Sequence, residues 1–479
     1  MNTNTSMTST NSHNAGSWRL WLGYAAMIGG TVGLFLLVRM YGERMSPIAA
    51  ETAGAAAGKA PAGVAAHPMM HVLIALLAII LLGRWLGQIF RHFGQPRVIG
   101  EMVAGIVLGP SLLGRISPDA MNFILPANVG PYLGIIAQLG VILYMFLVGL
   151  ELNAGLLRSH AHATVAISHA SIVAPFALGT ILALWLYQPL APEGVPFTSF
   201  ALFMGIAMSI TAFPVLARIL TDRKIDKTDL GVVALSCAAT DDVTAWCLLA
   251  FVVGIAQAEV GGAVQTIILA LAYIAFMFVV VRPLATRYFG HDAKKHPQPR
   301  MAVWVLVALL MSALTAEWIG IHAIFGAFLL GAIIPHDSDV ARDFQHKLED
   351  IVKILLLPAF FAYTGMRTEI GLISGWQAWA ICGMIILVAT LGKFGGTLAA
   401  ARFTGLNWRT SAALGILMNT RGLMELVVLN IGLEMGVISP ALFAMMVIMA
   451  LATTIATTPV LQLLTAGEYT TTNTAPARR

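Results

Sequence analysis

The stretch Ser236-Cys237-Ala238-Ala239-Thr240-Asp241-Asp242-Val243-Thr244-Ala245-Trp246-Cys247 places two adjacent carboxylates near the middle of an apolar segment. That segment runs from about Leu230 to Ile255, and a bilayer-spanning helix needs about 20 such residues. A charged side chain at the centre of a bilayer costs about 3 kcal/mol on insertion scales. The Asp pair therefore indicates a functional site, and a structural ion pair between helices is the alternative.

The composition is that of a polytopic helical membrane protein. Of 479 residues, 58% are hydrophobic and 11% charged, with a mean hydropathy of +0.82; soluble domains carry about 25% charged residues. The basic residues behind the net charge of +5 are spread over short loops, so no nucleic-acid partner is expected. The three cysteines lie in apolar segments without disulfide or metal spacing, which favours a packing role.

Thirteen candidate spans follow an N-terminal region over residues 1–68. That region holds a polar tail at 1–17, an apolar segment from Leu20 to Val38 and a linker. We interpret the apolar segment as an extra anchor helix; a signal-like sequence cleaved near Ala49 or Ala55 is the alternative. A short tail covers 465–479. The approximate limits of the spans are 69–90, 97–113, 130–152, 161–187, 198–221, 229–257, 264–286, 299–318, 320–335, 348–368, 375–403, 408–435 and 439–464.

Basic residues alternate between the loops. Because Lys and Arg concentrate in cytoplasmic loops, the basic loops and the C-terminus are expected to face the cytoplasm, most simply of a bacterial inner membrane. Arg39, Arg44 and Lys59 are exceptions in the N-terminal region. The residues that set the orientation are Arg91, Arg97, Arg158, Arg218, Arg223, Lys224, Lys227, Arg287, Lys294, Lys295, Arg300, Arg342, Lys347, Arg402, Arg409, Arg478 and Arg479.

The chain repeats short patterns at offsets of 210 to 222 residues. Each match pairs span n with span n+7, and because seven is odd the two halves are inverted in the membrane. Inverted repeats are typical of secondary transporters. The matches are Tyr144–Leu150 with Phe360–Met366, Gly205–Ser209 with Gly415–Asn419, and Ala104–Gly109 with Gly326–Gly331.

Two matching spans carry helix-breaking sequences. The fifth contains Met208–Pro214, where Pro214 removes a backbone donor, and the twelfth contains Asn419 and Gly422 in an apolar run. Corresponding interruptions in two halves indicate a transporter binding site. Arg421 can neutralise the negative helix ends at such breaks. The alternative is a simple proline kink.

Other charged residues in apolar surroundings need partners. In the kink alternative, Arg421 pairs with Glu425 four residues later. Lys393 lies about 15 Å from the basic end of its span and is expected to find a carboxylate, with snorkelling as the alternative. The carboxylates nearer span ends and the two histidines of the ninth span favour interfacial or structural roles; they are Glu101, Glu151, His322 and His336.

Four motifs resemble one family. Ile99–Gly114, Ser209–Leu220 and Asp241–Trp246 resemble the second helix, the fifth helix and the transport-site helix of the monovalent cation:proton antiporter-2 family. Asn419–Asn430 looks like the twelfth helix of its plant cation/proton exchanger branch. The resemblance covers about residues 69–464 and extends to bacterial Kef-type transporters with the Na+/H+ exchanger fold.

The resemblance implies an all-α fold of thirteen core helices and a homodimer. It implies a panel domain at 69–152 and 299–368 and a mobile core at 161–257 and 375–464, in which the fifth and twelfth helices cross. Asp242 would alternately bind a proton or a cation, and Asp241 would pair with Lys393. Two departures stand out: the chain ends about fifteen residues after its last span, without the cytosolic nucleotide-binding domain of many relatives, and Asp241 replaces the Asn that plant exchangers often carry.

The sequence predicts exchange of K+ or Na+ for protons by alternating access, with both ions competing for Asp242. Hydroxyls of Thr211 and Thr240 and free carbonyls at the breaks are candidate oxygen ligands. A channel-like K+ efflux protein and a non-transporting membrane sensor are the alternatives. No nucleophile–base set, metal cluster or nucleotide loop stands out, so neither an enzyme, a cofactor nor a bound metal is expected.

Overall fold

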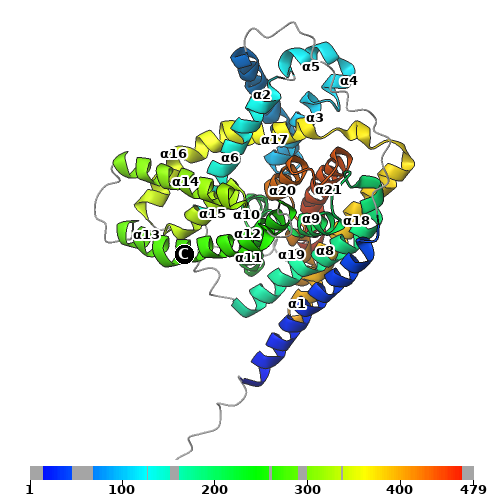
Figure 1. The fold of residues 1–479 in the computed structure, drawn as a ribbon, viewed down its shortest axis with the longest axis vertical. Coiled ribbons are helices and arrows are strands. Elements are labelled where there is room, and N and C mark those ends of the chain that lie inside the picture. Colours follow the sequence, from blue (N-terminus) through cyan, green and yellow to red (C-terminus); the bar gives the residue numbers. More distant parts are fainter. Residues whose placement is uncertain are drawn as a thin grey trace, which may run out of the picture.

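The computed structural model describes residues 14–45, 68–126, 128–151, 161–257, 262–289, 299–335 and 338–465. Within these ranges every regular element is a helix (Figure 1). The elements are α1 (Asn14–Gly42), α2 (Pro68–His92), α3 (Arg97–Leu108), α4 (Leu113–Ile116), α5 (Pro118–Ile124), α6 (Gly130–Glu151), α8 (Ala161–Leu190), α9 (Phe197–Ser209), α10 (Phe213–Asp222), α11 (Asp229–Gln257), α12 (Gly262–Phe276), η1 (Met277–Val281), α13 (Arg282–Phe289), α14 (Pro299–Ile319), α15 (Ala323–Ile333), α16 (Asp339–Ile351), η2 (Val352–Leu356), α17 (Leu357–Arg367), η3 (Ile370–Leu372), α18 (Gly375–Phe403), α19 (Trp408–Met418), α20 (Leu423–Glu434) and α21 (Pro440–Thr465).

Helices occupy all thirteen predicted spans and the N-terminal apolar segment. In the described part of the chain, eleven helical stretches are long and apolar enough to cross a membrane, and a bent pair raises the number to twelve. The ninth span is the short helix α15, which begins after a turn where His322 has φ 71°. The tenth combines α17 with the preceding turn η2 and the charged helix α16. The predicted all-α polytopic architecture is confirmed.

The N-terminal helix is longer than predicted. It begins at Asn14 and so includes the end of the predicted polar tail, while the rest of that tail and both candidate cleavage sites lie outside the described residues. Figure 1 shows α1 running along the outside of the bundle, where it packs on α8 and α9. Its C-terminal end is tied to the bundle, because Thr198 of α9 donates a hydrogen bond of 2.9 Å to Glu43, the residue after α1.

The fifth and twelfth spans are both interrupted. Between α9 and α10, residues 210–212 are extended, and Pro214 lies in the first turn of α10, where its missing N–H costs nothing. Between α19 and α20, residues 419–422 leave the helix, and the two halves are bent by 42°. The breaks meet, because the Ala212 N–H donates to the Thr420 carbonyl at 3.0 Å.

The long helices pack in two groups around these breaks. In one group, α8 and α18 pack on each other, with α9, α11, α19 and α21 against them. In the other, α3 packs on α2 and α17, and α6 packs on α15 and α17. The half-helix α20 lies between the groups, since it contacts α9 and α21 on one side and α17 on the other. Almost every residue of α9 and α20 is buried, so the breaks lie deep inside the protein.

Candidate functional site

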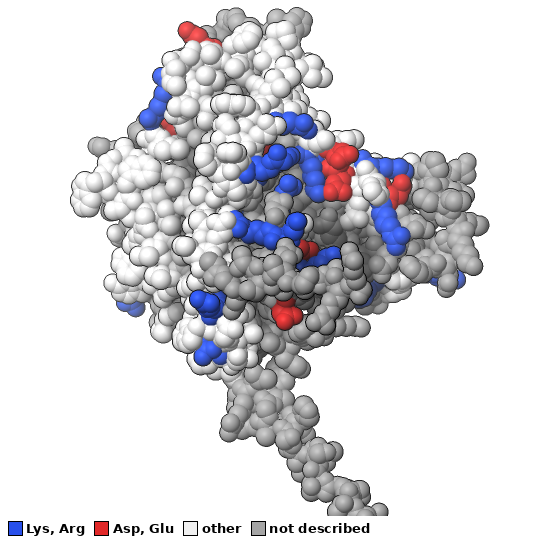
Figure 2. All heavy atoms as spheres, turned by 180° about the vertical axis from the view of Figure 1, so that it is seen from behind, with Lys and Arg blue, Asp and Glu red and all other residues white. Residues whose placement is uncertain are grey.

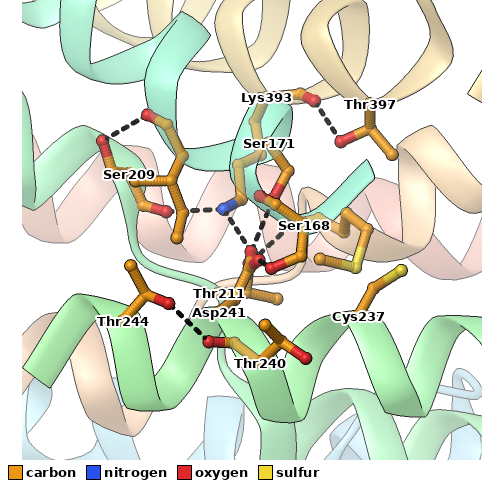
Figure 3. A network of polar contacts seen from close by, with 12 residues as sticks. Ser168, Ser171, Ser209, Thr211, Cys237, Thr240, Asp241, Thr244, Lys393 and Thr397 are labelled. Carbon is orange, nitrogen blue, oxygen red and sulfur yellow. Dashed lines mark hydrogen bonds and ion pairs between the residues drawn. The ribbon is translucent and has the colours of Figure 1, made fainter. Parts of the chain in front are cut away.

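Asp241 lies at the centre of a buried hydrogen-bond network (Figure 3). Its Oδ2 accepts from Lys393 Nζ at 3.0 Å, Ser171 Oγ at 2.6 Å and Thr211 Oγ1 at 2.8 Å. Its Oδ1 accepts from Ser168 Oγ at 2.5 Å. The donors come from α8, the fifth-span break and α18, so this carboxylate joins three separate segments to α11. Four donors match a carboxylate, which can only accept.

Lys393 links this network to a helix end. Its side chain is fully buried, and besides Asp241 it donates to the Ser209 carbonyl at 2.5 Å. Ser209 is the last residue of α9, and carbonyls there have no partner within the helix. The ammonium group therefore also offsets the partial negative charge of that helix end. The pairing of Lys393 with Asp241 leaves no role for snorkelling.

Arg421, in the break of the twelfth span, binds the same C-terminal end of α9. Its guanidinium donates to the carbonyls of Ala207 at 3.1 Å and Met208 at 2.7 Å, and to Glu425 Oε2 at 2.7 Å. Its backbone exchanges hydrogen bonds with the hydroxyl of Thr454 on α21. Arg421 is fully buried, so it is held by charge and by backbone at once. The capping role and the Glu425 ion pair, posed as alternatives in the sequence, occur together.

Asp242 is in a different situation from its neighbour. It is only 3% exposed, yet neither carboxylate oxygen has a hydrogen-bond partner among the described residues. The backbone N–H of Phe213, at the N-terminus of α10, faces it without forming a full hydrogen bond. Helix N-termini favour negative charge, so α10 supports a carboxylate here. An unpartnered buried carboxylate has acceptor sites available for a proton or a cation.

The remaining predicted residues are placed as follows. Thr211 donates to Asp241, and Thr240 donates to the Ser236 carbonyl one turn earlier on α11. Asn419 ends α19, and its Oδ1 is buried without a partner in the described structure. A Cβ at Gly422 would lie 2.7 Å from Val215 Cγ2, so close packing on α10 requires a glycine there. Whether the two threonines bind the transported ion stays a prediction.

A cavity of about 750 Å³ reaches the residues that follow the two breaks. Phe213 and Leu423, the first residues of the second half-helices, belong to its lining. Its wall includes Glu101, which the charges of Arg84, Arg97 and Arg218 face. Figure 2 shows Lys and Arg side chains gathered on one face beside a few acidic ones, against a mostly uncharged surface. Glu101 is therefore a cavity residue, while the side chain of Glu151 and all of His336 lie outside the described structure.

Sequence reasoning missed three polar residues. Ser168 and Ser171 on α8 bind Asp241, and Thr454 on α21 binds the twelfth-span break. Burying a hydroxyl in an apolar helix costs little free energy, because the hydroxyl can donate to a backbone carbonyl of its own helix. A search for buried charged residues therefore does not find these side chains. The available signal was a pair of serines three residues apart, which lie on one helix face.

Comparison with known proteins gives one consistent result. The transmembrane sodium/hydrogen exchanger family matches residues 72–466. The Na+/H+ antiporter NhaS4 of Synechocystis is 44% identical over 82% of this chain and 97% of its own length. Cation/H+ antiporter 17 of Arabidopsis thaliana is 38% identical, and K+/H+ antiporter 1 of Saccharomyces cerevisiae 34%. This chain spans about half the length of those two relatives, 48% and 47%.

A solved structure shares the fold. The sodium proton antiporter MjNhaP1 of Methanocaldococcus jannaschii superposes with a TM-score of 0.61 at 14% identity, over 83% of this chain and 96% of its own. The family match covers most of the chain and includes the crossed breaks, the Asp pair and Lys393. The chain is an integral membrane protein and belongs to the sodium/hydrogen exchanger family.

Proposed function

We propose that this protein exchanges K+ or Na+ for protons, and that Asp242 is the group that binds the proton and the cation in turn. The contrast between the two aspartates carries the proposal. Asp241 is saturated by four donors, whereas Asp242 has two buried oxygens without a partner in the described residues. Relatives named as Na+/H+ and K+/H+ antiporters support this class of reaction.

The buried charges suggest a stoichiometry. Among the described residues, five Asp, Glu, Lys or Arg side chains are buried: Asp241, Asp242, Lys393, Arg421 and Glu425. With their usual charges they sum to −1, and one proton or one monovalent cation on Asp242 brings the sum to zero. A net charge inside a membrane is costly. The site is therefore best suited to move in a neutral state, with one cation exchanged for one proton.

The packing of the helices in two groups is consistent with alternating access. The group with α8, α9, α11, α18, α19 and α21 would be the mobile core, and the group with α2, α3, α6, α14, α15 and α17 the panel. The cavity lies between them and reaches the second half-helices. In this proposal the basic cavity end faces the cytoplasm of a bacterial plasma membrane, the C-terminus lies on the same side, and two copies form a homodimer.

Reconstitution into liposomes with an internal pH dye tests the assignment. Additions of Li, Na, K and Rb salts should each report proton movement if that cation is exchanged, and saturation separates exchange from a channel. The Asp242→Asn variant should fold and show no cation-dependent proton flux. Asp343→Asn, which changes a partly exposed carboxylate on α16, is the matched control and should retain full flux. Undiminished exchange by a folded Asp242→Asn protein would sink the assignment.

A further inference from the structure

A cluster of polar side chains ties α20 to α6 and α17. Glu434 accepts from Arg367 Nη1 at 2.9 Å through Oε1, and from Gln138 Nε2 at 3.2 Å through Oε2. Asn430 donates to Thr364 Oγ1 at 2.7 Å, and its Oδ1 accepts from Arg367 Nη1 at 3.2 Å. Glu434 and Asn430 belong to α20, while the other three residues belong to α6 and α17. Every one of these bonds joins the half-helix α20, which lies between the two packed groups, to the group that contains α6 and α17.

This cluster lies at the opposite end of the same helices that line the cavity. Leu147 of α6, Leu357 of α17 and Leu423 of α20 belong to the cavity wall. The nearest cavity and polar residues are six residues apart on α6 (Tyr144 and Gln138), three on α17 (Phe361 and Thr364) and seven on α20 (Leu423 and Asn430). At 1.5 Å per residue these separations are about 5–11 Å. The seam between the helices is therefore open at one end and bridged by polar side chains at the other.

The space at the bridged end is small. A void of about 20 Å³ is lined by Gln138, Val141, Tyr363, Asn430 and Glu434, among others. Such a volume holds about one water molecule, so it offers no continuous path for a hydrated ion. The Tyr363 ring also lies under the Arg367 guanidinium, 4.9 Å from its centroid, which holds the arginine across the seam.

The polar bridge can open at low energetic cost. The side chains of Arg367 and Glu434 are 28% and 30% exposed, and ion pairs with this exposure are weak individually. Within the described part of the chain, no hydrogen bond joins these five residues to the Asp241 network, so the bridge can open without disturbing that network. We propose that Gln138, Thr364 and Arg367 form with Asn430 and Glu434 a polar gate that closes the pathway on the side away from the cavity. The gate rests on the proposed alternating access and must open once in each cycle.

Cross-linking tests whether the gate has to open. Gln138 and Glu434 are replaced by cysteine in a background that lacks Cys237, Cys247 and Cys382. The two new cysteines are joined by a short bifunctional reagent that forms a reducible disulfide with each of them. Exchange in liposomes should stop and return when the link is reduced, and this comparison within one protein excludes misfolding. The control pair is Asp343→Cys with Lys347→Cys, whose partners both lie on α16. Full exchange by the linked gate would overturn the proposal.

Thiol labelling tests gate opening without any transport. Val141 lines the void and is 1% exposed, so Val141→Cys should react with a hydrophilic thiol reagent only while the gate is open. Glu434→Gln should raise the labelling rate about fivefold, which corresponds to about 1 kcal/mol. The control Lys347→Met, within α16, should leave the rate unchanged, and an Arg367→Glu, Glu434→Arg double variant should bring it back towards the parent value. An unchanged rate in Glu434→Gln would refute the gate even if Asp242→Asn abolishes exchange.

Discussion

Removal of the Lys393 side chain would test the energetics of the buried network. Lys393→Ala deletes two bonds, those to Asp241 Oδ2 and to the Ser209 carbonyl. It leaves Asp241 with three hydroxyl donors but with no cation. Breaking a buried ion pair from one side costs about 3–5 kcal/mol, because the remaining charge is uncompensated. The remaining hydroxyl donors place Lys393→Ala towards the lower end of that range.

The reciprocal variant should cost more. Asp241→Ala leaves a buried ammonium and three hydroxyls, from Ser168, Ser171 and Thr211, without their common acceptor. Ser171 and Thr211 keep backbone acceptors, the carbonyls of Ser168 and Met418. The orphaned groups are therefore the Lys393 charge and the Ser168 hydroxyl, and an unsatisfied buried hydroxyl adds about 1–3 kcal/mol. In the double variant neither charge of this pair remains, so its cost should fall below the sum of the singles by several kcal/mol. This ordering follows from the count of orphaned groups.

The assay is a double-mutant cycle on purified protein. Stability in detergent is measured by denaturant or thermal unfolding for the parent, Lys393→Ala, Asp241→Ala and the double variant, and the pH profile of exchange is recorded for those that fold. The ion pair should also help to set that pH range, because Asp241 lies beside Asp242 on α11. Additive losses in the cycle would show that the two side chains do not interact, and would refute the reasoning.

Three further outcomes are expected. Gly422→Ala should destabilise the protein by about 1–3 kcal/mol and slow exchange, because its Cβ would press on Val215; Gly383→Ala on exposed α18 surface, with nothing within 4 Å, is the neutral control in the same unfolding assay. Potassium should be exchanged at least as well as sodium in the dye assay, since Asn419–Asn430 resembles the plant exchangers; strict preference for sodium or lithium would contradict this. The rate of exchange should not depend on an imposed membrane potential if the loaded site is neutral, whereas a strong voltage dependence would show net charge movement.

Much of the fold could be predicted because bilayer burial imposes a simple pattern. Apolar length located the spans, and Pro214 and Gly422 located the breaks, since both act through local backbone geometry. The contacts of Lys393 followed from the cost of an isolated buried charge. The hydroxyl contacts of Ser168 and Ser171 could not be predicted, because they depend on which faces of α8 and α11 meet. The polar gate escaped prediction for the same reason: its members lie 66 and 296 residues apart in sequence.

The half-helix α20 connects the site to the gate. The break that precedes α20 contains Arg421, which donates to carbonyls at the end of α9. Glu425, in the first turn of α20, forms an ion pair with Arg421. Nine residues after Glu425, or about 14 Å along the axis, Glu434 closes the gate. A short helix of this kind moves as a rigid body, so a movement of its first residues also moves Asn430 and Glu434 at its other end. In the proposed exchange cycle, loading of Asp242 beside Phe213 would reach the gate through α20, because Ala212 of the first break is hydrogen-bonded to Thr420 of the break that precedes α20.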